Sequence, residues 1–265
     1  LREALGPVAD RMDNRHADKL KMDWWCGTVL PTNWKLAMEA FMEGFHTPTT
    51  HPQLHEVSYK ASRAFGVGAD GVLLNEDVDA RGAVNLHVDF LAKLSEGMDG
   101  MVHKSEVAVL ETLRDLAVPE DPDAATGVFY ATAWKSVEED AHARGAPIFD
   151  IARVNTGQPF NAVEFMFPHY FLLPMMGAMS SYRIRPLTPE TCFFEIWSLV
   201  IRPDGEAYET PTEPTVLPHD SPLFPEIPRQ DYANLPLQQQ GLHDLSHMRL
   251  ARDHEGLISN YQRLV

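Results

Sequence analysis

The chain has 265 residues, 44% of them hydrophobic and 23% charged, which is enough to bury one large core or two modest ones. A formal net charge of −16 argues against nucleic acid or an anionic membrane as a partner. The two cysteines, Cys26 and Cys192, argue against a disulfide scaffold, and no apolar run approaches the roughly 18 residues that span a bilayer. These features predict a globular, cytoplasmic enzyme domain.

The first part of the chain is predicted to begin with a polar lead-in and to continue into a helix. Residues 1–22 indicate a helix or a linker, and apolar residues recur at helical spacing over 33–46. Alternating segments separated by glycines run from Ser58 to Phe90, and within them 72–74 and 83–88 are predicted to be two strands with turns around them.

The rest of the chain is predicted to combine helices with strands, because the apolar spacing changes along it. Helices are predicted over 105–116 and 127–144 and from about Asp231 onward, strands over 162–173, 180–186 and 192–202, and a proline-rich connector over 210–228. Strands and helices segregated in this way indicate an α+β fold with an antiparallel sheet.

Two histidines five positions apart form the most informative motif. Glu43 lies three positions before His46, which places both on one face of the predicted helix. Because Pro48 disfavours helical geometry at the preceding residue, the helix should end near His46 and leave His51 free to fold back. Two neutral imidazoles placed in this way can chelate iron or zinc. Taken alone, such a pair among twelve histidines is more often an unremarkable surface or core pair.

The flanking residues place this pair in a wider pattern. The run Asn33-Trp34-Lys35, then Glu43, two residues, His46, four residues and His51, resembles the catalytic domain of the α subunit of Rieske-type non-heme iron aromatic-ring-hydroxylating oxygenases. Segments that look like the central strands and the C-terminal region of that family are 165–168, 182–187, 230–231, 240–242 and 258–263. The resemblance covers nearly the whole chain.

The resemblance implies mononuclear Fe(II) held by two histidines and one carboxylate, with other coordination positions open for O2. Carried over to this chain, the ligands are His46, His51 and Asp231. Asp231 is chosen because it precedes the Gln-Gly-Leu segment as the ligand of the family does. Asp244 and Asp253 are the alternatives for this third ligand.

Glu43 stands where the family has an acid, usually aspartate, that hydrogen-bonds toward the Rieske cluster of a neighbouring subunit. The resemblance therefore implies electron relay by Glu43. The [2Fe–2S] cluster itself needs two cysteines and two histidines in paired motifs, which Cys26 and Cys192 do not provide. Residues 1–265 are expected to be a single catalytic domain whose Rieske domain is missing, and the start at Leu1 fits a trimmed segment.

The resemblance also implies the fold and the partners. It predicts a helix-grip fold, in which a curved antiparallel sheet wraps a long C-terminal helix. NAD(P)H and flavin are expected on a separate reductase, with a ferredoxin or reductase as electron donor, because the chain has no Gly-x-Gly-x-x-Gly and no Walker loop. The intact enzyme would be a homotrimer or an α3β3 assembly. Ring dihydroxylation is the first expectation, with monooxygenation or O-demethylation as alternatives.

An aromatic substrate next to the iron would need a mostly apolar cleft. Met42 and Phe45 flank the metal motif, and Phe167, His169 and Phe171 alternate on one side of a predicted strand. These five residues are the candidate substrate contacts. The opposing interpretation is a hydrophobic core, to which stripes of methionine and aromatic residues more often belong.

Other interpretations stay open from the sequence. His243 and His247 are four apart, with His254 nearby, but Asp244 stands where zinc peptidases carry glutamate. A solvated helix face, or a partner that orients an iron ligand, is the more ordinary interpretation of this cluster. The chain could also be a non-catalytic helix-grip domain that binds a hydrophobic small molecule without iron, or a structural oxygenase subunit without metal ligands.

Overall fold

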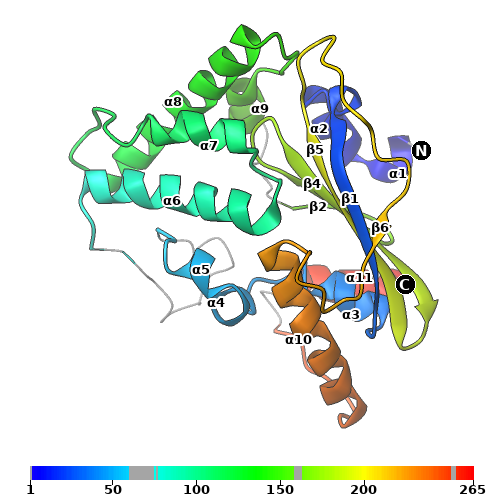
Figure 1. The fold of residues 1–265 in the computed structure, drawn as a ribbon. Helices are drawn as coiled ribbons and strands as arrows, with labels where there is room; N and C mark the ends of the chain where they lie inside the picture. Colours follow the sequence, from blue (N-terminus) through cyan, green and yellow to red (C-terminus); the bar gives the residue numbers. More distant parts are fainter. Residues whose placement is uncertain (1, 60–74, 76, 158–162, 252–254) are drawn as a thin grey trace.

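A six-stranded sheet in the order β2-β3-β4-β5-β1-β6 lies at the centre of the computed structural model (Figure 1). The structure describes residues 2–59, 75, 77–157, 163–251 and 255–265. Neighbouring strands are antiparallel, except that β6 pairs with β1 in parallel. The strands are β1 (Lys21–Leu30), β2 (Glu164–Met166), β3 (Tyr170–Pro174), β4 (Met179–Thr188), β5 (Thr191–Val200) and β6 (Thr215–Val216).

The helices lie around this sheet in separate groups. Figure 1 shows α6, α7 and α8 together beside the sheet, and α3, α10 and α11 near its other end. The helices are α1 (Arg2–Leu5), α2 (Pro7–Asn14), α3 (Trp34–Glu39), α4 (Thr47–Thr50), α5 (Pro52–His55), α6 (Ala80–Met98), α7 (Lys104–Glu111), α8 (Pro122–Ala143), α9 (Ile151–Gly157), α10 (Glu226–His243) and α11 (Gly256–Leu264), with a 3-10 turn at Ala17–Lys19.

Side chains alternate between the two faces of the sheet, as the period of a strand requires. Tyr182, Phe194 and Ile196 are at most 2% exposed and belong to the main hydrophobic core. The opposite face carries the buried Glu195, which accepts hydrogen bonds from Arg183 Nε and Nη2 at 2.8 Å each. Helix α2 covers part of this second face through a smaller hydrophobic cluster.

Residues 83–88 are part of α6, so the prediction of a strand there is wrong. Val84, Val88 and Leu91 are buried at helical spacing, and this period becomes clear only over the whole helix. Six residues with alternating polarity were too short a window to separate the two periods. The other strand predicted in this region, over 72–74, lies outside the described residues.

The strand predicted over 162–173 is a hairpin in the part that the structure describes. Strand β2 is followed by a turn that contains the cis Phe167–Pro168 peptide bond, and β3 then runs back along β2. The prediction that residues 165–173 alternate along a single strand is therefore wrong. β2 is an edge strand rather than a central one, whereas the strands predicted over 180–186 and 192–202 are confirmed as β4 and β5.

The helix predicted over 33–46 is shorter than expected. Helix α3 ends at Glu39, and a turn then leads to α4. Pro48 lies in the first turn of α4. The N–H groups of a first turn have no partner within the helix, so a proline there costs no hydrogen bond. The prediction that Pro48 ends a helix at His46 is therefore wrong, because the proline begins the next one.

Several other helices and strands differ from the prediction in their bounds or were not predicted. The lead-in over 1–22 contains α1 and α2, and β1 was not predicted. The connector over 210–228 contains β6, and α10 begins at Glu226, so Asp231 lies in its second turn rather than at its start. The predicted C-terminal helix is divided into α10 and α11.

The prediction of an α+β fold is confirmed. A mostly antiparallel sheet packed with helices is consistent with a helix-grip architecture. The helices predicted over 105–116 and 127–144 are confirmed as α7 and α8, whereas α9 was not predicted. Within the described residues, no helix combines the length and the apolar character needed to cross a membrane.

Candidate metal centre

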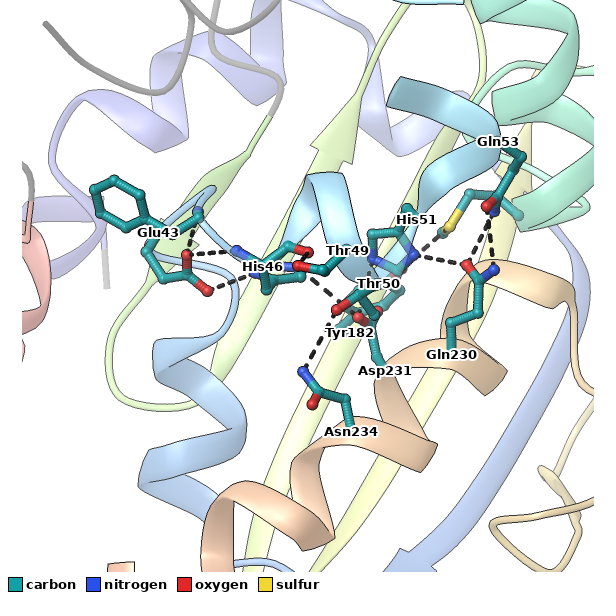
Figure 2. A network of polar contacts seen from close by, with 12 residues as sticks. Glu43, His46, Thr49, Thr50, His51, Gln53, Tyr182, Gln230, Asp231 and Asn234 are labelled. Carbon is teal, nitrogen blue, oxygen red and sulfur yellow. Dashed lines mark hydrogen bonds and ion pairs between the residues drawn. The ribbon is translucent and has the colours of Figure 1, made fainter. Parts of the chain in front are cut away.

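Three side chains from distant parts of the chain meet between α4 and α10 (Figure 2). His46 immediately precedes α4, His51 lies between α4 and α5, and Asp231 projects from α10. One ligating atom from each lies within 4.8 Å of the others. In the described ranges of the chain, this is the one group of at least three histidine, cysteine or acidic side chains with such a geometry.

Glu43 holds the ring of His46 in place. Its Oε1 lies 2.5 Å from His46 Nδ1, and its Oε2 accepts hydrogen bonds from the backbone N–H groups of Phe45 and His46. The predicted proximity of Glu43 and His46 is therefore correct, although a turn and not a helical face produces it. His46 Nε2 points toward Asp231 Oδ1, at 3.8 Å.

Gln230 plays the corresponding part for His51. Gln230 Oε1 lies 2.7 Å from His51 Nδ1, and His51 Nε2 lies 3.0 Å from Asp231 Oδ1. Burial lowers the pKa of His51, but the hydrogen bond and charge of Asp231, with contributions from Gln230 and Glu226, outweigh burial and raise the pKa above its usual value.

Asp231 is a buried carboxylate, with a side chain only 6% exposed. Within the described residues, its ion-pair partners are His46 and His51, and no lysine or arginine pairs with it. Burial raises the pKa of Tyr182 well above its usual value, and the charge of Asp231 raises it further. Because a buried carboxylate needs a positive partner, this environment favours a cation beside Asp231.

The donor set fits a mononuclear iron site. Both histidines engage protein acceptors through Nδ1, so the Nδ1 atoms carry hydrogen and the two Nε2 atoms face Asp231. Two imidazole nitrogens and one carboxylate oxygen on one side of a cation are the donor set of oxygen-activating Fe(II) sites. Three protein ligands leave coordination positions for other molecules.

Asp244, the alternative ligand that the structure describes, does not join this group. Asp244 is the exposed residue directly after α10, and Asp253 and His254 lie outside the described residues. His243 is the last residue of α10 and binds Glu190, with Nε2 and Oε2 3.0 Å apart. His247 follows the end of the helix and is exposed, so the paired helical histidines of a zinc peptidase are not formed here.

The five candidate substrate residues occupy different environments. Met42 is 7% exposed and belongs to the main core, and Phe171 is fully buried in the same core. Phe45 and Phe167 are about half exposed, at 49% and 51%. His169 lies in the turn between β2 and β3, and its buried Nδ1 has no hydrogen-bond partner within the described residues. Met42 and Phe171 thus share the main core, whereas Phe45 and Phe167 lie largely at the surface.

Sequence reasoning missed Gln53, Gln230 and Tyr182. The positions of Gln53 and Gln230 in the sequence, two after His51 and one before Asp231, were the only available signal. Two small cavities in the described part of the chain lie against Glu106 and against Arg15, and neither is lined by the three candidate ligands.

A His–His–carboxylate group on an α+β scaffold, with His51 and Asp231 buried, is the arrangement expected of a mononuclear metalloenzyme domain. Residues 9–265 match the family described as the ring hydroxylating alpha subunit, catalytic domain, and the chain belongs to this family. The chain is thus the catalytic domain of a ring-hydroxylating oxygenase α subunit, and the family implies mononuclear non-heme iron, an aromatic substrate, O2 and electron-transfer partners. A search among curated proteins found no match.

Proposed function

We propose that the chain binds one Fe(II) through His46, His51 and Asp231 and uses O2 to hydroxylate an aromatic or related hydrophobic substrate. The observation that carries this proposal is the convergence of three ligating atoms within 4.8 Å around a buried carboxylate. Family membership supports the same donor set. When bound, Fe(II) supplies O2 activation through the coordination positions that the protein leaves open.

Ring dihydroxylation is the preferred reaction. It places both atoms of O2 in the product and consumes two electrons and two protons, which an electron-transfer protein and solvent would supply. Monooxygenation or O-demethylation would place one oxygen atom in the product and the other in water. The same three ligands serve each outcome, so the choice depends on how the substrate is held.

Residues of the chain itself orient the two candidate histidine ligands and limit the access of water to the site. Glu43 holds His46 and Gln230 holds His51, so both Nε2 atoms are directed at one point before a metal arrives. The side chains of His51 and Asp231 are each 6% exposed, which protects this point from bulk water. Phe45, Met42, Phe167, His169 and Phe171 remain the proposed substrate contacts.

Glu43 is also the proposed electron relay from the [2Fe–2S] cluster of a partner subunit. Its side chain is 15% exposed and lies next to the exposed Phe45, so it joins His46 to the surface. The proposal includes a single catalytic domain over residues 1–265, a Rieske domain elsewhere, a ferredoxin or reductase with NAD(P)H and flavin, a homotrimer or α3β3 assembly, and a cytoplasmic location.

The test is a single-turnover reaction with labelled oxygen. The chain is loaded anaerobically with Fe(II), supplied with electrons from a viologen mediator, and mixed with a panel of aromatic compounds and 18O2. Labelled product is expected, with both atoms from O2 for dihydroxylation and one for monooxygenation. Equal binding of the aromatic compounds with and without iron, and no labelled product, would overturn the proposal in favour of a binding domain.

A further inference from the structure

Two glutamine side chains form a closed amide pair beside the candidate metal centre (Figure 2). Gln53 lies in α5 and Gln230 in α10. Gln53 Nε2 donates to Gln230 Oε1 at 2.9 Å, and Gln230 Nε2 donates to Gln53 Oε1 at 3.1 Å. Gln230 Oε1 also accepts from His51 Nδ1 at 2.7 Å, so one oxygen receives two hydrogen bonds.

This pairing restricts which atom Gln230 presents to His51. An amide oxygen only accepts hydrogen bonds and an amide nitrogen only donates them. If either amide turned alone, it would set oxygen against oxygen and nitrogen against nitrogen across the pair. A turn of Gln230 alone would therefore break both hydrogen bonds to Gln53 as well as the contact with His51, so the pair opposes that turn.

The orientation of Gln230 decides the tautomer of His51. An oxygen facing Nδ1 favours the tautomer with hydrogen on Nδ1, which leaves the lone pair of Nε2 available to a metal. A nitrogen facing Nδ1 would favour hydrogen on Nε2. That hydrogen would point at Asp231 Oδ1, 3.0 Å away, and would occupy the place that a metal needs.

We infer that Gln53 and Gln230 are positioning residues that hold His51 in its metal-binding tautomer and join α5 to α10 across the site. This inference rests on the proposed function, because it assumes that His51 is a ligand. Neither glutamine belongs to the candidate ligand group. Gln230 acts through His51, and Gln53 acts through Gln230.

The test measures Co(II) and Fe(II) affinity by competition titration in four variants. Gln230→Met removes the acceptor and is expected to weaken metal binding about 10- to 100-fold. Gln230→Glu keeps an acceptor oxygen and is expected to retain affinity within about 3-fold. Gln53→Met leaves Gln230 free to turn, and a smaller loss is expected. Gln240→Met, at an exposed position of α10, is the matched control and should not change the affinity.

A second measurement separates tautomer control from general support of the fold. In the metal-free protein with 15N-labelled histidine, at a pH where the ring is neutral, His51 of the parent and of Gln230→Glu should show hydrogen on Nδ1. In Gln230→Met this signal should be lost or exchange-broadened, while the thermal midpoint of the metal-free protein stays close to that of the control variant. If Gln230→Met does not fold, the same 15N measurement is made on Gln53→Met, whose substituted position is only half-buried.

The outcomes distinguish the inference from the proposed function. A parent chain that binds no metal would overturn the proposed function. Metal binding by the parent, with unchanged affinity in Gln230→Met and Gln53→Met, would overturn the inference alone. Equal losses in Gln230→Met and Gln230→Glu would also overturn it, because the acceptor oxygen would then not be what matters.

Discussion

His51 Nε2 lies 3.0 Å from Asp231 Oδ1, although strands β2 to β6 and helices α5 to α9 lie between the two residues in sequence. The contact joins the short helices after α3 to the second turn of α10. Its geometry depends on how α10 packs against the rest of the fold. Substitutions that move α10 should therefore alter metal binding without touching a ligand.

Gly97 in α6 provides such a substitution. A Cβ at this position would lie 2.8 Å from both Cδ1 and Cγ1 of Ile227, which is buried in the first turn of α10. Gly97→Ala should lower the free energy of unfolding by about 1–3 kcal/mol through overpacking and should weaken metal binding. Urea unfolding and a Co(II) titration would measure the two effects.

The matched control is Gly127→Ala in α8, where a Cβ meets nothing within 4 Å. Alanine there should be neutral or stabilising by up to about 1 kcal/mol, because glycine is a poor helix former. Adding Ile227→Val to Gly97→Ala should restore part of the loss. An unchanged stability of Gly97→Ala, or no coupling with Ile227→Val, would contradict the close contact between α6 and α10.

Glu43 should contribute to metal affinity as well as to electron delivery. Its carboxylate binds both the ring of His46 and the turn that carries it. Glu43→Ala should weaken Co(II) binding about 10- to 100-fold, because the ring loses its orienting partner. Glu39→Ala, which removes the acid that binds Gln262, is the control. If Glu43→Ala slowed turnover at unchanged metal affinity, Glu43 would act as a relay only.

His87 should make the metal-free fold sensitive to acid. The ring of His87 stacks on Phe129 and forms hydrogen bonds with the hydroxyl groups of Thr126 and Tyr130. Burial in this environment lowers the pKa of His87 to about 4. His87 binds its proton near pH 6.5 in the unfolded chain but only near pH 4 in the folded chain. The contribution of the neutral ring to the free energy of unfolding is therefore fully present above pH 6.5 and is lost as the pH falls toward 4. Between pH 7 and pH 5, the loss due to His87 should reach at most about 2 kcal/mol.

Urea unfolding of His87→Gln at pH 7 and pH 5 measures this contribution. The variant should lose less stability on acidification than the parent, whereas His142→Gln, at an exposed position of α8, should behave like the parent. An equal loss in the parent and in His87→Gln would show that other groups cause the acid sensitivity.

The sequence predicted the candidate site better than it predicted the elements that carry it. His46, His51 and Asp231 were selected by residue type and order, and these depend little on the exact ends of helices. Residues 83–88 and 162–173 were assigned from short alternating patterns, which α6 and the hairpin at Pro168 contradict. The pairing of Gln53 with Gln230 depends on the approach of α5 to α10, which no local pattern reports.

The most direct test of the metal centre is iron content after anaerobic reconstitution with Fe(II). The parent chain and Asp244→Ala should each hold about one iron per chain, as expected for a mononuclear site. His46→Ala, His51→Ala and Asp231→Ala should each lose most of it. Iron retained in Asp231→Ala would contradict the assignment of the third ligand, and a parent chain without bound iron would contradict the account as a whole.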